Sequence, residues 1–136
     1  MKKSILITLT LSATLFSACT TCKNVASQET IYGDWQIETA MDKSTQNGDQ
    51  PATISFGSDG RVNGCATVNS FFGDYKNNKG KLTFSTVGMT RMMGQSMDIE
   101  RAICDALDKT STIEVKGDRA TIYDKQGKAI MELKKK

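Results

Sequence analysis

The chain has 136 residues, with 18 lysines and arginines, 15 aspartates and glutamates and no histidine. The lack of histidine excludes hydrolases of the Ser-His and Cys-His kinds, which need an imidazole base, and it removes the commonest metal ligand. A formal net charge of +3 is too small to gather polyanions, so we expect no binding of nucleic acid. The length fits a single domain with one hydrophobic core.

The first nineteen residues, MKKSILITLTLSATLFSAC, have the pattern of an export signal. Lys2 and Lys3 precede a short apolar stretch that ends at Phe16, and the cleavage site ends in Cys19. An ordinary signal-peptidase site needs a small residue where Phe16 stands, whereas a lipoprotein site tolerates an apolar residue there and requires the cysteine. The apolar stretch is also too short to cross about 30 Å of hydrocarbon. We therefore predict a bacterial lipoprotein signal over residues 1–18 and acylation of Cys19.

Cleavage before Cys19 leaves 136 − 18 = 118 residues and lowers the net charge to 16 − 15 = +1. Acyl chains contribute about 0.8 kcal/mol per buried CH₂, so several of them hold a small domain on a bilayer. We expect a monomer in the bacterial cell envelope, anchored by its lipid at the outer membrane, with another envelope protein as its partner and no cofactor.

Residues 19–30 are polar and lack a period, which is typical of a flexible tether. The folded domain is expected over residues 31–136. From Trp35 to Ala40 apolar and polar residues alternate, which predicts a half-buried strand, and a polar loop follows over residues 42–50.

Further strands are expected over residues 52–56, 61–69, 75–76 and 81–85, with turn sequences at 57–60 and 77–80. The inward side of the 61–69 strand would carry Val62, Gly64, Ala66 and Val68. Such small residues favour close packing against a bulky neighbour, which we expect to be a helix.

The spacing of apolar residues changes near Ser96, from the alternation of a strand to that of a helix. Apolar residues then recur at the three-and-four spacing of an amphipathic helix, which we predict over residues 96–108. Ser96 can cap this helix, and Asp98 and Glu100 lie in its first turn, where the positive helix end favours carboxylates. Three closing strands are expected over 112–116, 119–124 and 128–133. The chain is therefore mostly β (α+β), and a closed antiparallel barrel would remove its exposed edges.

The carboxylates lie in turns or in the first turn of the helix, so we interpret them as turn and cap residues and expect no enzymatic activity. They are Asp34, Asp59, Asp74, Asp98, Glu100 and Asp124.

Three segments together resemble the META domain, a family of HslJ-like bacterial envelope proteins. They are residues 31–35 (IYGDW), residues 54–75 and residues 90–92 (TRM), and the resemblance continues through the helix and the closing hairpin. It implies a small lipocalin-like antiparallel barrel with one helix packed on it, links to stress tolerance and no established catalytic activity. The motif positions are Asn69, Gly73, Tyr75, Thr90, Arg91 and Met92.

The chain departs from this family at two positions where cysteine is common, because Val68 and Gly94 stand there. Cys65 and Cys104 remain in the domain, while Cys22 lies in the tether. An even number of cysteines in an oxidising compartment favours pairing, so we hypothesise a Cys65–Cys104 disulfide worth about 3–4 kcal/mol. The alternative is two buried free thiols.

Met89, Met92, Met93 and Met97 are clustered in sequence. Thioethers bind Cu(I), so the cluster is a candidate metal site, but methionine also packs irregular loops without any metal. Arg91 is interpreted as a structural arginine that pairs with Asp34, Asp74 or a carbonyl group, and anion binding is the alternative.

These observations favour a lipid-anchored envelope protein without enzymatic activity that is stress-related or binds another envelope component. One alternative is a small-ligand carrier, which would need an interior cavity of roughly 300 Å³ or more beside Trp35, Phe56 and Phe84. Another is a hydrolase inhibitor that acts through an exposed loop over residues 70–73, where Phe71 and Phe72 are adjacent.

Overall fold

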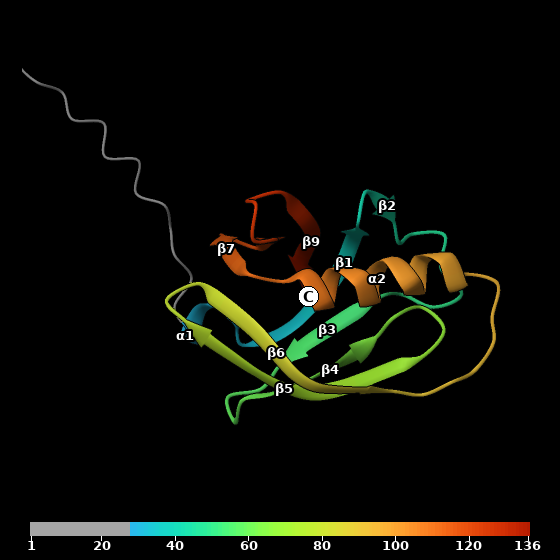
Figure 1. Ribbon diagram of the computed structural model, residues 1–136, viewed down its shortest axis with the longest axis horizontal. Helices are drawn as coiled ribbons and strands as arrows, with labels where there is room; N and C mark the ends of the chain where they lie inside the picture. Colours follow the sequence, from blue (N-terminus) through green and yellow to red (C-terminus); the bar gives the residue numbers. More distant parts are fainter. Residues whose placement is uncertain (1–27) are drawn as a thin grey trace, which may run out of the picture.

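The computed structural model describes residues 28–136 (Figure 1). The predicted signal peptide, the acylated Cys19, Cys22 and the tether up to residue 27 lie outside the described residues. The elements in chain order are α1 (Gln28–Ile31), β1 (Gly33–Ala40), β2 (Lys43–Ser44), β3 (Thr53–Phe56), β4 (Arg61–Cys65), β5 (Ser70–Asn78), β6 (Lys81–Met89), α2 (Met97–Lys109), β7 (Thr112–Lys116), β8 (Arg119–Tyr123) and β9 (Ala129–Lys135).

The strands form one antiparallel sheet in the order β2-β1-β3-β4-β5-β6-β7-β8-β9, and β1 also pairs with β9. That last pairing closes eight strands into a barrel and leaves β2 as a short outer strand on β1. The prediction of a small, mostly β antiparallel barrel with one helix is confirmed. The shortest strand pairing in the barrel is between β6 and β7, where only one residue pair is in register, Lys81 with Thr112.

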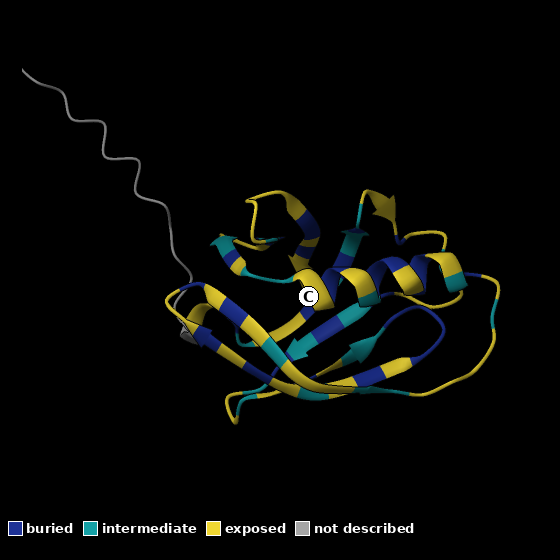
Figure 2. Ribbon diagram, in the orientation of Figure 1, coloured by how far each residue is buried: buried dark blue, intermediate teal, exposed yellow. Residues whose placement is uncertain are grey.

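The barrel interior is filled by side chains. Trp35 and Ile37 of β1 are fully buried, as their alternation predicts, and the indole Nε1 of Trp35 donates a hydrogen bond to the carbonyl oxygen of Ile31 at 2.9 Å. That bond ties α1 to the wall of the barrel. Figure 2 shows the alternation of buried and exposed residues along β5.

Helix α2 packs against β1, β2 and β9. Its buried apolar residues follow the predicted three-and-four spacing and are Ile99, Ala102, Ile103, Ala106 and Leu107. Among the residues described, 28–136, no helix is long and apolar enough to span a bilayer.

Three local predictions are wrong. The strand expected over 61–69 ends at Cys65, because Thr67 adopts a left-handed φ of 77° and the amide of Ala66 bonds the carbonyl of Asn69 at 2.8 Å, which makes a tight loop. Residues 70–73, expected as an exposed loop, begin β5. The small residue Gly64 makes room for the ring of Phe71, not for the helix, because a Cβ there would lie 2.5 Å from Cζ of that ring.

Candidate functional site

The buried residue Asn69 lies at the centre of a hydrogen-bond cluster, which we call the asparagine hub: Asn69, Thr90, Met92 and Glu100. Its side chain is 1% exposed. The Nδ2 group donates to the carbonyl of Met92 at 2.9 Å, and Oδ1 accepts from the hydroxyl of Thr90 at 2.9 Å and from the amide of Met92 at 2.6 Å. One side chain therefore joins the β4–β5 loop to the loop between β6 and α2.

The hub also holds helix α2. Glu100 is only 6% exposed, and its carboxylate accepts from the backbone amide of Asn69 at 2.8 Å and from Nδ2 at 2.9 and 3.1 Å. Buried carboxylates are costly unless hydrogen-bonded, so these donors are what makes a charge at this position tolerable. The sequence-based interpretation of Glu100 as a helix-end residue missed this role.

A second set of polar contacts lies beside the hub. The hydroxyl of Ser96 is 2.9 Å from that of the buried Thr67 and accepts from the amide of Asp49 at 2.9 Å. Ser96 occupies the N-cap position of α2 but makes no side-chain cap bond, which corrects the predicted cap. Its hydroxyl instead connects the start of the helix to two loops.

Gly73 and Tyr75, two further motif positions, support the sheet. A Cβ on Gly73 would lie 3.0 Å from the carbonyl oxygens of Ser85 and Thr86, where β6 bulges against β5. The hydroxyl of Tyr75 donates to the carbonyl of Gly57 at 2.7 Å. Burial raises the pKa of Tyr75 to about 12, because the phenolate would lose its hydration, with smaller contributions from nearby Tyr32 and Asp59.

Arg91 does not form the ion pair that we predicted from the sequence. Its side chain is exposed, and among residues 28–136 it makes no ion pair with Asp34, Asp74 or any other carboxylate. The motif residues on either side of it contact Asn69 instead, Thr90 through its hydroxyl and Met92 through its backbone. The predicted pairing of Arg91 with Asp34 or Asp74 is therefore wrong.

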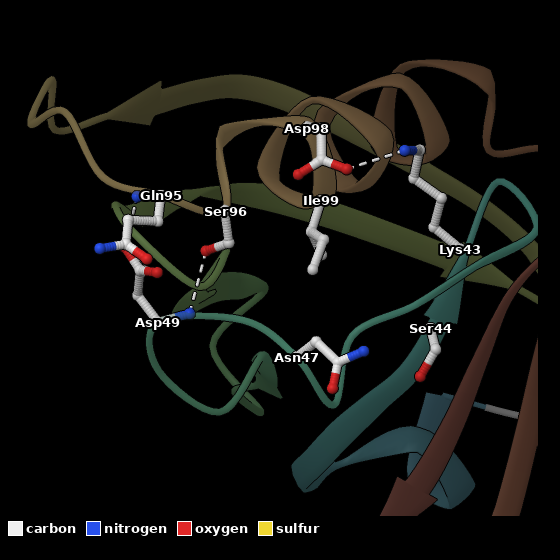
Figure 3. A pocket seen from close by; sticks show the side chains of 8 residues that line it. All are labelled: Lys43, Ser44, Asn47, Asp49, Gln95, Ser96, Asp98 and Ile99. Atoms are coloured by element: carbon white, nitrogen blue, oxygen red, sulfur yellow. Dashed lines mark hydrogen bonds and ion pairs between the residues drawn. The ribbon is translucent and has the colours of Figure 1, made fainter.

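A polar hollow of about 460 Å³ lies where α2 begins. Figure 3 shows the side chains that line it. Its lining residues are Lys43, Ser44, Asn47, Asp49, Gln95, Ser96, Asp98 and Ile99. Lys43 Nζ lies 2.8 Å from Asp98 Oδ2, and this hydrogen bond holds the pKa of Asp98 below its usual value. Asp49 accepts from the amide of Gln95 at 2.9 Å. The charged groups of the hollow are thus already partnered.

An exposed apolar surface lies next to the hub, and we call it the apolar rim. It consists of Phe72 (58% exposed), Val87 (39%), Met92 (57%) and Met93 (87%). Phe72 pairs across the sheet with Gly88, and a Cβ on that glycine would lie only 2.8 Å from the Phe72 ring. The missing side chain lets the aromatic ring lie flat on β6.

The interior expected of a ligand carrier is occupied. Trp35 and Phe56 are buried, and the Phe56 ring packs at 5.0 Å from Tyr75 and 6.3 Å from Phe84, measured between ring centroids. A hollow of about 400 Å³ that Phe84 does line lies instead between β6 and the end of α2. Side chains therefore fill the space where a carried ligand would lie.

A family model described as META domain matches residues 27–136. The chain belongs to the META domain family. The matched region begins one residue before α1, so the short helix is part of the domain.

Solved structures show the same fold for this META domain. An NMR structure of a protein from Burkholderia xenovorans has a TM-score of 0.61 and 21% identity, and the alignment covers 98% of both chains. A second NMR structure has a TM-score of 0.63 and 22% identity over 79% of this chain and 93% of its own. A crystal structure of a DUF4847 family protein from Bacteroides vulgatus ATCC 8482 has a TM-score of 0.56 and 11% identity, covering 78% and 94%. No curated protein matches the chain.

The disulfide hypothesis is wrong, because Cys65 and Cys104 of this META domain are free thiols. Cys65 ends β4, where its sulfur lies 3.9 Å from Oε1 of Gln50. Cys104 lies on α2, and its sulfur contacts that of Met89 at 3.8 Å. Helix α2 is held by the Glu100–Asn69 bonds instead of a covalent bridge.

The methionine cluster is divided by the fold. Met89 packs against the core, whereas Met92 and Met93 are exposed in the loop that follows, and Met97 is half-buried at the start of α2. The sulfur that meets Met89 is that of Cys104, which the sequence did not connect with it.

Proposed function

We propose that this META domain is a lipid-anchored, non-enzymatic envelope protein that binds another envelope protein through the apolar rim. The observation that carries the proposal is that four large apolar side chains are exposed, and that Asn69 holds the backbone of one of them, Met92, by two hydrogen bonds. A single exposed apolar residue means little, but several on neighbouring segments mark interaction sites.

The rim residues lie on two neighbouring strands and on the loop that follows them. Phe72 on β5 lies over Gly88 on β6, next to Val87. The amide of Thr90 bonds the carbonyl of Ser70 at 3.0 Å, so the loop that carries the two exposed methionines leaves the sheet beside the start of β5. Aromatic side chains and methionine are enriched at the centres of protein interfaces.

The hub lowers the entropic cost of binding. Asn69 fixes both the amide and the carbonyl of Met92, so the loop does not have to be ordered by the partner. Preorganised surfaces lose less conformational entropy on association and therefore bind more tightly for the same buried area.

The position of the rim favours a protein partner over the bilayer. The chain enters the described domain through α1, which lies at the opposite end of the molecule from the loop between β6 and α2 (Figure 1). Eight residues lie between Cys19 and Gln28, and the nine Cα–Cα steps that join these two residues span about 30 Å at most when extended. An anchor at Cys19 therefore attaches to the end of the domain opposite the loop that carries the two exposed methionines.

The anchor is tested by Cys19→Ala in the full chain. We expect the variant to remain folded, with the fluorescence of its single, buried Trp35 unchanged, and to move from the membrane fraction to the soluble fraction. Retention in the membrane fraction would contradict the proposed lipid anchor.

The rim is tested by cross-linking in intact envelopes. We expect the wild-type chain to capture one protein that the double variant Phe72→Ser/Met93→Ser does not capture. Lys76→Ser is the matched control, because it changes an exposed residue at the far end of the same strand. Equal capture by both variants and the wild type, at equal thermal stability, would refute the role of the rim.

A further inference from the structure

Two half-buried sulfur atoms meet where helix α2 approaches the end of strand β6. Cys104 Sγ lies 3.8 Å from Met89 Sδ, although the two residues are 15 positions apart in sequence. Met89 is the last residue of β6 and packs against the core, in contrast to the fully exposed thioether of Met93. The pair is thus fixed by two regular elements and remains partly accessible.

The surroundings of this pair are acidic. Desolvation by burial raises the pKa of the Cys104 thiol, and the carboxylates of Glu100, Asp108 and Asp105 raise it further. Three carboxylates therefore surround the thiol, and their negative charge attracts a cation to this position. Among the described residues no three His, Cys, Asp or Glu side chains converge on a metal site, so hard or borderline ions such as Zn²⁺ lack the set of ligands they need.

We propose that Cys104 and Met89 bind one soft monovalent cation of the Cu(I) class, which bridges α2 and β6. Thiolate and thioether are the ligands that Cu(I) selects. With metal–sulfur distances of about 2.3 Å, sulfurs 3.8 Å apart subtend an S–metal–S angle of roughly 110°, which suits a three- or four-coordinate ion. The thiol proton passes to solvent as the metal–sulfur bond forms, and the oxidation state of the metal does not change. The one or two remaining positions of such an ion are open to solvent or to an external ligand.

The site differs from the four-methionine cluster suggested by the sequence. It uses Met89 alone from that cluster and takes its second ligand from the helix. The inference does not depend on the apolar rim or on a protein partner.

The test is an anaerobic titration of the full chain with Cu(I) against a competing chelator. Cys19→Ala and Cys22→Ser form the background, so that the two cysteines outside the described residues cannot bind the metal. We expect one equivalent bound with a Kd below about 1 µM, one proton released, and an X-ray absorption spectrum with two sulfur neighbours. The fluorescence of Trp35 checks that each variant is folded.

Variants assign the two ligands. Cys104→Ser should abolish the bound equivalent, with Cys104→Ala as a second version should serine perturb the helix. Met89→Leu, which keeps the volume, should weaken binding by about tenfold or more. Cys65→Ser removes the other free thiol, Met93→Leu removes an exposed thioether, and both should bind as the parent does. Binding weaker than about 1 µM, binding that survives loss of Cys104, loss of binding in Cys65→Ser, or unchanged affinity in Met89→Leu would each overturn the proposal.

Discussion

Replacing Asn69 with alanine tests whether the asparagine hub, and not a disulfide, holds helix α2 and the loop before it on the barrel. The variant loses the Nδ2 donor to Glu100 and to the carbonyl of Met92, and the Oδ1 acceptor for Thr90 and for the amide of Met92. Only the backbone amide of residue 69 would still bond the buried carboxylate.

The expected loss of stability follows from which partners can turn to water. Glu100 is buried and charged, and the loss of its hydrogen bond costs about 2 kcal/mol. Thr90 and Met92 are exposed residues whose freed groups can find water, so together they add about 1 kcal/mol. The sum of about 3 kcal/mol is a large part of the 5–15 kcal/mol typical of a domain, and it corresponds to a fall in Tm of roughly 10 °C.

The assay is urea unfolding of the Cys19→Ala chain, followed by the fluorescence of Trp35, the only tryptophan. Asn63→Ala is the matched control, because it makes the same change at an exposed position of β4 and should cost less than about 0.5 kcal/mol. In the Asn69→Ala background, Glu100→Gln should recover about 1 kcal/mol, since it removes the poorly paired buried charge. A loss for Asn69→Ala no larger than that of Asn63→Ala would refute the reasoning.

Three further outcomes are expected. Burial raises the pKa of Tyr75 to about 12, so the unfolded state loses this proton at a lower pH than the folded state does. The free energy of unfolding should therefore fall as the pH rises from about 10 to about 12. In urea titrations across that range, Tyr75→Phe should reduce this fall. Gly64→Ala would place its Cβ against a backbone oxygen of β3, and thermal unfolding should show a loss of stability of about 3 kcal/mol or more. In Gly88→Ala the new Cβ meets only an exposed phenylalanine ring, so the loss should be about 1 kcal/mol. Similar losses in the two variants would show that neighbouring atoms move to relieve the crowding at Gly64. Because Cys65 and Cys104 are free, dithiothreitol should leave the Tm unchanged, and a drop of several degrees would reinstate a disulfide.

Local sequence patterns were sufficient to predict most of the strands and the main helix. The alternation at the start of β1 and the three-and-four spacing of α2 depend on which side chains of one segment face the core, and the structure has both. The turn predicted at 77–80 is present, with Gly80 at a φ of 90° between β5 and β6. The lengths of the strands were less predictable. β5 and β6 pair with each other well beyond the few residues in which apolar and polar side chains clearly alternate.

Residues of the hub illustrate what local patterns miss. The resemblance pointed to Asn69, Thr90 and Met92 without assigning them a role, and Glu100 was interpreted as a helix-end carboxylate. Residues 69 and 100 are 31 apart in sequence, and their contact depends on the tight loop at Thr67 and on the path of the chain from β6 to α2. A glutamate four residues beyond a serine at the helix start is the only local signal that could have raised the question.

The sequence by itself determined the order of strands and helix, because hydrophobic periodicity and turn residues act over a few neighbouring positions. The family and its barrel came from the resemblance of three sequence segments to the META domain. It also supports the predicted lipoprotein signal and anchor, which remain predictions. Only the tertiary structure decided the partners of individual side chains: the sulfur of Cys104 meets Met89, Cys65 lies apart from it, and Arg91 is exposed. Such pairings depend on how the barrel closes and where the helix packs on it, which are properties of the whole chain.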